Sequence, residues 1–154
     1  MRTQQIQSYE YNLGQLFSRV AKANATRCAL VFLDKEEISY ENLEVLSNRI
    51  ANWLVAKGTA KGDVIAIFHD KSRMAFACMI ACLKIGAIYV NLDPESPKIR
   101  LQRMLQTCKP KQLWAPDHVC LSGCETDLGV CLQIDFTDET INREILASCL
   151  LYTS

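Results

Sequence analysis

The sequence predicts an α/β fold with a mostly parallel sheet and βαβ crossovers. Short apolar runs at 64–68, 87–90 and 112–115 alternate with helix-like segments, which is typical of βαβ units. The run at 64–68 is apolar on both faces, as expected for a strand covered by helices on two sides. The stretch 83–97 contains, in order, a helix end, a glycine, a short strand and a new helix start, so it organises the predicted sheet.

Length and charge limit the classes of function. The chain has 154 residues, 49% of them hydrophobic, which is enough for the core of one domain. Its 17 basic residues balance 17 acidic ones, and no basic stripe indicates nucleic acid. Residues 1–12 lack the apolar core of a signal peptide. The longest apolar run, 75–83, is far below the roughly 20 residues that span a bilayer. We expect a cytoplasmic protein without a nucleic-acid or membrane partner.

The chain has many cysteines for its length. The eight are Cys28, Cys78, Cys82, Cys108, Cys120, Cys124, Cys131 and Cys149. Several of them lie in apolar segments and no secretory signal precedes them. They are therefore interpreted mainly as small buried side chains of a protein in a reducing compartment.

The first structured segment is expected to be a helix that begins after Asn12. Residues 1–11 are polar and are expected to be loosely held. Asn12 is a suitable N-cap, and apolar residues recur at helical spacing on one face. These residues are Leu13, Leu16, Phe17, Val20 and Ala21.

A hairpin and a long helix are expected next. The apolar run 28–33 precedes a turn, and 37–39 can pair back on it. Ser39 is the expected N-cap of a long amphipathic helix, which Gly58 closes. The inward face of this helix carries Leu43, Leu46, Ile50, Trp53 and Leu54, and we interpret Trp53, like Trp114, as a core or subdomain-interface aromatic.

Two further helices follow the strand at 64–68. Ser72 is expected to cap a helix that is apolar nearly all round and deeply buried, and Gly86 is expected to end it with positive φ. Ser96 is the expected N-cap of the next helix, with Pro97 in its first turn. An ion pair between Asp93 and Arg100 would fix the entry of this helix. A last strand at 130–134 and a weak helix from 138 or 140 are expected in the remaining chain.

Two motifs resemble those of a known family. The first, L-K-x-G-A-x-Y-V-x-L-D-P-x-x-P-x-x-R, spans 83–100, and the second, I-S-Y-x-x-L, spans 38–43 and is followed by Gly62-Asp63. Both resemble core motifs near the N-terminus of adenylate-forming (AMP-binding) enzymes. They are most similar to those of nonribosomal peptide synthetase adenylation domains. The resemblance covers about residues 12–116, and Asn91 departs from the proline usual at its position.

The resemblance implies an activity and its partners. Family members activate a carboxylate with ATP to give an acyl-adenylate and pyrophosphate, then pass the acyl group to a thiol of a carrier protein or CoA. It implies that this chain is an incomplete first subdomain of the adenylate-forming fold. The phosphate loop, adenine-binding residues, magnesium-binding acid and catalytic lysine of the family lie downstream. No catalytic, cofactor-binding or metal-binding residue is therefore assigned here, although ATP and magnesium are expected for a full-length member.

The predicted organisation has three parts. Residues 1–11 are a flexible N-terminal segment and 12–147 a partial AMP-binding subdomain. Residues 148–154 complete no element and resemble read-through from a cloning or sequencing join. The chain is thus interpreted as a truncated part of an ATP-dependent ligase for a carboxylate, expected to be an amino acid, and inactive alone. The alternative is a stand-alone α/β module that docks on a partner.

Three local patterns were considered as sites. Residues 57–62 resemble a phosphate loop but run into Asp63, which favours a plain turn. His69, Asp70 and Ser72 are triad-type residues, but neighbours on one loop point in different directions, so an enzyme built on this loop is disfavoured. His118, Cys120, Cys124 and Cys131 have one C-x3-C spacing where structural zinc sites usually have two tight knuckles, which favours incidental cysteines.

Overall fold

The computed structural model describes residues 11–68, 71–115, 132–134 and 139–147. Some predictions concern residues outside these ranges. They are the predictions for residues 1–10 and 148–154, and for the possible zinc ligands His118, Cys120, Cys124 and Cys131. The elements in chain order are α1 Leu13–Ala23, β1 Cys28–Val31, β2 Glu37–Ser39, α2 Tyr40–Ala56, β3 Val64–Phe68, α3 Arg73–Ile85, β4 Ile88–Leu92, α4 Lys98–Cys108, β5 Gln112–Trp114, β6 Leu132–Ile134 and α5 Glu139–Ala147.

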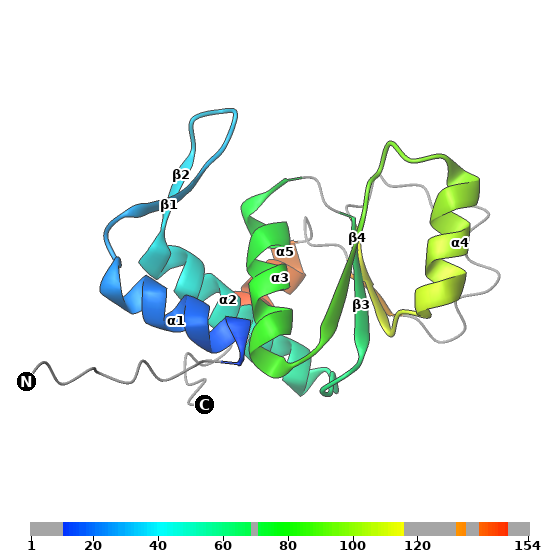
Figure 1. Cartoon of the computed structure of the whole chain (residues 1–154), viewed down its shortest axis with the longest axis horizontal. Coiled ribbons are helices and arrows are strands. Elements are labelled where there is room, and N and C mark those ends of the chain that lie inside the picture. The colour runs from blue at the N-terminus through cyan, green and yellow to red at the C-terminus, as the bar shows by residue number, and fades with distance from the viewer. Residues whose placement is uncertain (1–10, 69–70, 116–131, 135–138, 148–154) are drawn as a thin grey trace, which may run out of the picture.

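The predicted α/β architecture is confirmed. Four strands form a sheet in the order β4-β3-β5-β6, and all three pairings are parallel. Helix α4 lies on one side of this sheet and α3 on the other, with α2 and α1 beyond α3 (Figure 1). The predicted hairpin is also present, as an antiparallel pair of β1 and β2. No helix in the described ranges is long and apolar enough to cross a membrane.

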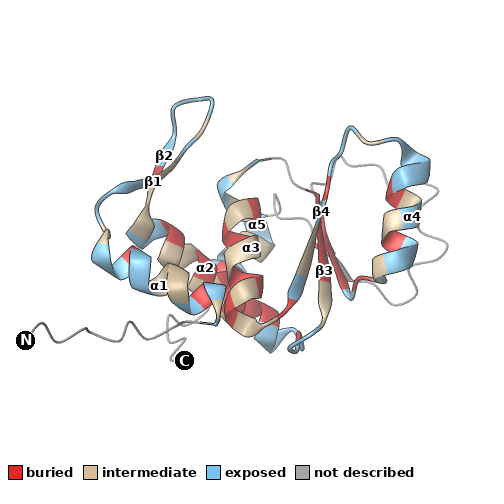
Figure 2. Ribbon diagram, in the orientation of Figure 1, coloured by how far each residue is buried: buried red, intermediate tan, exposed pale blue. Residues whose placement is uncertain are grey.

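Strand β3 separates two apolar cores, which explains why its sequence is apolar on both faces. Ile65 and Ile67 face α2 and α3, whereas Ala66 and Phe68 face α4, and all four are fully buried (Figure 2). Successive side chains of a strand point to opposite faces, so a strand between two helical layers needs apolar residues at every position.

Most of the predicted helix boundaries are confirmed by their capping bonds. The Asn12 side chain accepts the N–H of Gly14 at 2.7 Å, and the hydroxyl of Ser39 accepts that of Asn42 at 3.2 Å. Gly86 ends α3 in the left-handed region with φ of 73°. Strand β4 runs two residues beyond the predicted 87–90, because Asn91 and Leu92 continue the pairing with β3.

The predicted start of α4 is wrong by one residue. Pro97 has an extended ψ of 137°, and its carbonyl accepts the first helical bond, from Arg100 N–H at 2.9 Å. Pro97 is therefore the N-cap residue, without a side-chain cap. The ion pair expected between Asp93 and Arg100 is also absent from the described residues. The Asp93 carboxylate instead accepts the N–H of Glu95 at 3.0 Å and closes a local turn after β4.

The burial expected for α1 and α3 is only partly right. Leu13 and Val20 of α1 are 60% and 36% exposed, although they lie on the predicted inward face. In α3 the fully buried side chains are small ones, such as Ala77 and Cys78, while the large apolar residues are only half-buried.

Helix α1 crosses α3 at Gly14. A Cβ on Gly14 would lie 2.7 Å from both the Cα and the N of Lys84 and 2.9 Å from the carbonyl carbon of Leu83. These neighbours are backbone atoms, which cannot move aside as a side chain can. The close crossing therefore requires glycine at this position.

We expect Gly14→Ala to destabilise the chain by about 1–3 kcal/mol, because the added methyl group forces the two helices apart. Helix propensity alone would stabilise the variant by about 0.5–1 kcal/mol. Urea unfolding followed by circular dichroism measures the difference. The matched control is Gln15→Ala, at an exposed position of the same helical turn. Equal or greater stability of Gly14→Ala would contradict the close crossing.

Asp63 fixes the entry into β3. Its Oδ2 accepts hydrogen bonds from Lys111 Nζ at 2.7 Å and from the N–H of Ala60 at 2.7 Å. These two bonds, the lysine's first, lower the pKa of Asp63 below its ordinary value of 3.8, and partial desolvation opposes them only weakly. Lys111 also donates to the carbonyl of Gly58 at 2.8 Å, so one ammonium joins the end of α2 to the start of β5.

Asp63→Asn is expected to cost about 0.5–1 kcal/mol at pH 7, because Asn retains an acceptor for Ala60 but loses the charge opposite Lys111. A lowered carboxyl pKa stabilises the fold above pH 3.8 and stops doing so as the pH falls through the folded-state pKa. The two proteins should therefore converge in stability as the pH falls below 3.8 and through the folded-state pKa of Asp63. Thermal unfolding of both proteins from pH 7 down to acidic pH measures how their difference in stability changes. The control is Asp34→Asn, which removes a carboxylate that likewise accepts a backbone N–H.

Candidate functional site

The sheet order indicates where a ligand would bind in such a fold. Strand β3 lies between β4 and β5, and the crossovers through α3 and α4 lie on opposite faces. In open α/β sheets, ligands usually bind at the carboxyl ends of the strands where the winding direction changes, here between β3 and β5. His69, Asp70 and residues 116–131, which follow these strand ends, lie outside the described residues.

The structure describes only one member of the triad-type set His69, Asp70 and Ser72. The Ser72 hydroxyl accepts the N–H of Ala75 at 3.2 Å and caps α3, as predicted. The preceding Lys71 has φ of 61°, a left-handed conformation that turns the chain into the helix. Ser72 thus has the structural role that the sequence favoured.

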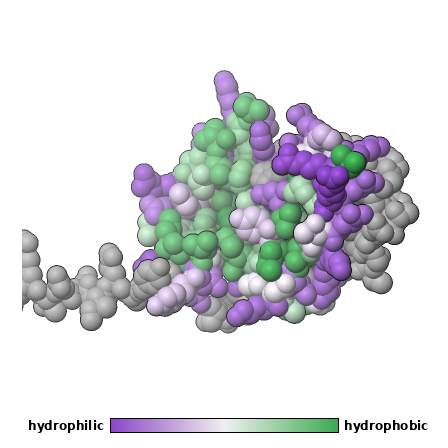
Figure 3. Space-filling view, turned by 45° about the vertical axis from the view of Figure 1, so that its right-hand side comes forward, coloured by the Kyte–Doolittle hydropathy of each residue, from purple (hydrophilic) through white to green (hydrophobic). Residues whose placement is uncertain are grey.

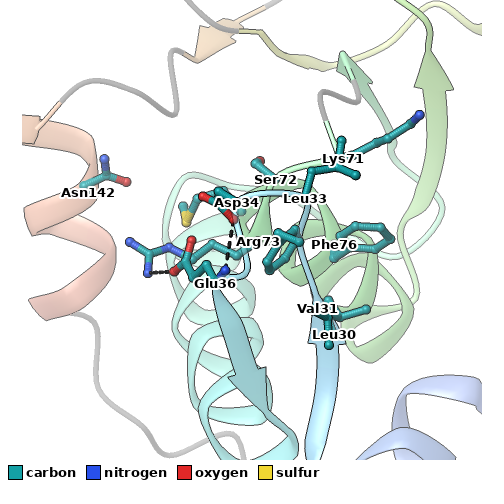
Figure 4. A pocket seen from close by; sticks show the side chains of 12 residues that line it. Leu30, Val31, Leu33, Asp34, Glu36, Lys71, Ser72, Arg73, Phe76 and Asn142 are labelled. Carbon is teal, nitrogen blue, oxygen red and sulfur yellow. Dashed lines mark hydrogen bonds and ion pairs between the residues drawn. The ribbon is translucent and has the colours of Figure 1, made fainter.

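A hollow lies between the hairpin and the start of α3 (Figure 4). It has a volume of about 840 Å³, and α5 contributes Asn142 to its lining. Apolar side chains form much of the wall, among them Leu30, Val31, Leu33 and Phe76. Its size alone would admit a small-molecule ligand.

The polar groups of this hollow serve local structure. Arg73 and Glu36 form an ion pair at 2.8 Å, and both side chains are about half exposed. Asp34 accepts the N–H of Glu36 at 3.0 Å within the hairpin turn. The Ser72 hydroxyl accepts a capping bond from the first turn of α3. The apolar part of its wall is suited to contact with another apolar surface.

A second hollow, of about 420 Å³, extends this apolar surface along α1 and α3. It shares Leu30 and Phe76 with the first. We call the combined surface the α1–α3 apolar face, and Figure 3 shows apolar side chains gathered in a broad area on one side of the molecule. Its members are Leu13, Leu16, Phe17, Val20, Leu30, Val31, Leu33, Phe76, Met79, Ile80, Leu83 and Tyr89. Monomeric proteins rarely expose large continuous apolar patches, so this face has the character of an interface.

A buried charged cluster lies behind this face. Lys84 Nζ donates to Glu44 Oε2 at 2.7 Å, to Ser47 Oγ at 2.9 Å and to Asn48 Oδ1 at 2.6 Å. Only 3% of the Lys84 side chain is exposed. Burial lowers the pKa of Lys84, and the hydrogen bond and charge of Glu44 oppose that shift.

The sequence reasoning missed the Lys84 cluster. In the sequence, Lys84 is identified only as a residue of the motif over 83–100, at the end of an apolar helix. The available signal was the presence of a lysine in a helix predicted to be buried all round, because a buried lysine needs acceptors. Those acceptors, on α2, could not be identified without the tertiary structure.

The described cysteines are free thiols and give no reactive centre. Cys78 and Cys82 are fully buried, as predicted, and burial together with the neighbouring Cys82 raises the pKa of Cys78 well above its ordinary value. Burial also raises the pKa of Cys108. Cys28, in contrast, is exposed. Within the described ranges no three His, Cys, Asp or Glu residues could together hold a metal ion.

Comparison with known sequences identifies relatives. A family model of AMP-binding enzymes matches residues 17–149. Malformin synthetase mlfA of Aspergillus homomorphus is 40% identical over 100 residues, which are 65% of this chain and 2% of the synthetase. The Aspergillus niger synthetase of the same name is 41% identical over 73 residues, 47% of this chain and 2% of its own length.

Solved structures show the same fold at low sequence identity. Klebsiella oxytoca NpsA in complex with 3-hydroxyanthranilyl-AMSN superposes with a TM-score of 0.74 at 22% identity, over 95% of this chain and 28% of NpsA. VinN in complex with 3-methylaspartate superposes with a TM-score of 0.80 at 19% identity, over 95% of this chain and 41% of VinN. A Mycobacterium tuberculosis fatty acyl CoA synthetase superposes with a TM-score of 0.79 at 17% identity, over 93% of this chain and 30% of the synthetase.

The structural matches cover at least 93% of this chain, and every match covers a minor part of the relative, in agreement with the predicted partial subdomain. The two sequence motifs, the parallel sheet and the family match over 17–149 point to the same group of proteins. The chain belongs to the family of AMP-binding, adenylate-forming enzymes and corresponds to a part of their adenylate-forming domain.

Proposed function

We propose that this chain is the first structural part of an ATP-dependent ligase that activates an amino acid as its adenylate. The observation that carries the proposal is the family match over residues 17–149. The similarity to a peptide synthetase supports an amino acid as the carboxylate. A carrier-protein or CoA thiol would then accept the activated acyl group. The proposal includes a cytoplasmic location, with which the free thiols of the described cysteines agree.

In this proposal the chain supplies scaffold rather than chemistry. Ser72, Glu36 and Arg73 of the hollow beside the hairpin take part in a helix cap and an ion pair, and burial raises the pKa of the Cys78 thiol and keeps it protonated. ATP, magnesium and the carboxylate would be bound by residues of the domain beyond those described. The chain alone is therefore proposed to be inactive.

The partner of the α1–α3 apolar face is proposed to be the remainder of the same adenylate-forming domain. Leu33, Val31 and Leu13 on this face are 103%, 65% and 60% exposed. This protein matches 28% of the NpsA chain and 41% of the VinN chain, so more than half of each relative lies outside the match. A second candidate function is that of a stand-alone module that docks on a separate protein, and exposure of the same face favours it.

The isolated chain is expected to give no amino-acid-dependent ATP–pyrophosphate exchange above a blank without protein. Exchange of radiolabelled pyrophosphate into ATP, with a mixture of the proteinogenic amino acids, measures this. A complete adenylation domain assayed in parallel verifies that the conditions support exchange. Substrate-dependent exchange by the chain would contradict the proposed division of labour.

The apolar face is expected to bind an apolar fluorescent dye such as ANS. Leu13→Ser should lower the dye signal, because Leu13 lies on this face. Ile99→Ser on α4 is the matched control, since Ile99 is 61% exposed and Leu13 60%, but Ile99 lies on the opposite side of the sheet. Titration of each variant with dye compares them at equal protein concentration. Equal signals from the two variants would contradict a role for this face.

A further inference from the structure

We propose that Lys84 is a positioning residue: the ion pair and hydrogen bonds of its buried ammonium fix how α1 docks, and thereby form the α1–α3 apolar face. The docking of α1 is inferred from contacts within this chain. The consequence for the apolar face as an interface rests on the proposed function.

The acceptors for the ammonium come from one face of α2. Glu44, Ser47 and Asn48 are related by i, i+3 and i+4 spacing, so their side chains lie together on the helix surface. They are joined to one another, because Asn48 Nδ2 donates to Glu44 Oε1 at 3.3 Å and the Ser47 hydroxyl donates to the carbonyl of Glu44 at 3.0 Å. This arrangement holds α3 against α2 in one register, since a shift of either helix would leave a buried charge without partners.

Helix α1 also packs against Lys84. The backbone of Lys84 forms the surface on which Gly14 packs, and the Lys84 ammonium lies 5.7 Å from the centre of the Phe17 ring. A cation at this distance over an aromatic face is attracted to it. The Phe17 ring also lies 6.2 Å from the ring of Tyr40, the first residue of α2. Lys84 therefore contacts α1 with its backbone and with its charged end.

The large apolar side chains of α1 are only partly buried. Its large apolar residues Leu13 and Val20 are 60% and 36% exposed. Gly14 and Ala21 are its buried residues, and both are small. Apolar contact is not directional, so it tolerates sliding and rotation. The charged cluster supplies directional contacts, which explains a lysine at a position where a methionine would fill the same space.

Hydrogen exchange of the whole chain, resolved to peptides by mass spectrometry, tests the proposal. In Lys84→Met we expect the α1 amides to exchange at least about tenfold faster, with a smaller change in β3. Unfolding by heat reports global stability. In Lys84→Met/Glu44→Met the buried carboxylate is removed as well, so the melting temperature should return toward that of the wild type while α1 stays unprotected.

Lys57→Met is the matched control. It removes another lysine paired with a glutamate, but at the exposed C-cap of α2 and with its partner Glu144 on α5, and should leave α1 exchange unchanged. Unchanged α1 protection in a folded Lys84→Met variant overturns the proposal. Recovery of both the melting temperature and the α1 protection in the double variant also overturns the proposal, because an apolar side chain of similar volume would then be sufficient to position α1.

A milder variant decides the question if Lys84→Met does not fold. Glu44→Gln keeps an acceptor for the ammonium but removes the opposite charge, so α1 exchange should accelerate. Unchanged exchange overturns the proposal. None of these measurements involves ATP, so the result is independent of the pyrophosphate-exchange assay that tests adenylation.

Discussion

The structure depends on the burial of β3 between two helical layers. β3 is paired on both edges, with β4 and with β5, and its alternate side chains enter the two apolar cores. The cores then determine where the helices lie, since α3 must cover one face and α4 the other. The turn before β3 is fixed by Asp63 and Lys111, which bring the end of α2 and the start of β5 to the same point.

Beyond α3 the packing changes in character. In the core that it shares with β3 and α2, α3 buries small residues such as Ala77 and Cys78, and these contacts are apolar. On the side of α1 and α2, the buried Lys84 introduces a charge that must be matched by Glu44 and its neighbours. The large apolar side chains of α1, α3 and the hairpin are left at the surface. An exposed apolar face of this kind agrees with the proposed role as one part of a larger adenylating domain.

The sequence predicted local structure well, because local signals determine it. Asn12, Ser39, Ser72 and Gly86 were placed correctly as caps, since a cap needs only its own side chain and the next turn of the helix. The N-cap of α4 was wrong because the choice between Ser96 and Pro97 depends on the turn that Asp93 makes. The prediction of an Asp93–Arg100 ion pair was wrong for the same reason. The absence of an assigned catalytic residue stays a prediction, since the strand ends at which a ligand would bind lie outside the described residues.

The sequence alone determined the α/β class, the order of strands and helices along the chain and, through two motifs, the family. These properties follow from periodicity, capping and residue identity, which neighbouring residues carry. Only the tertiary structure decided which side of each helix is buried, that Gly14 must be glycine, and that Lys84 lies in a cluster with residues about forty positions earlier. Such features arise where helices distant in sequence meet, and a buried charge or a close backbone contact has no local pattern that identifies its partner.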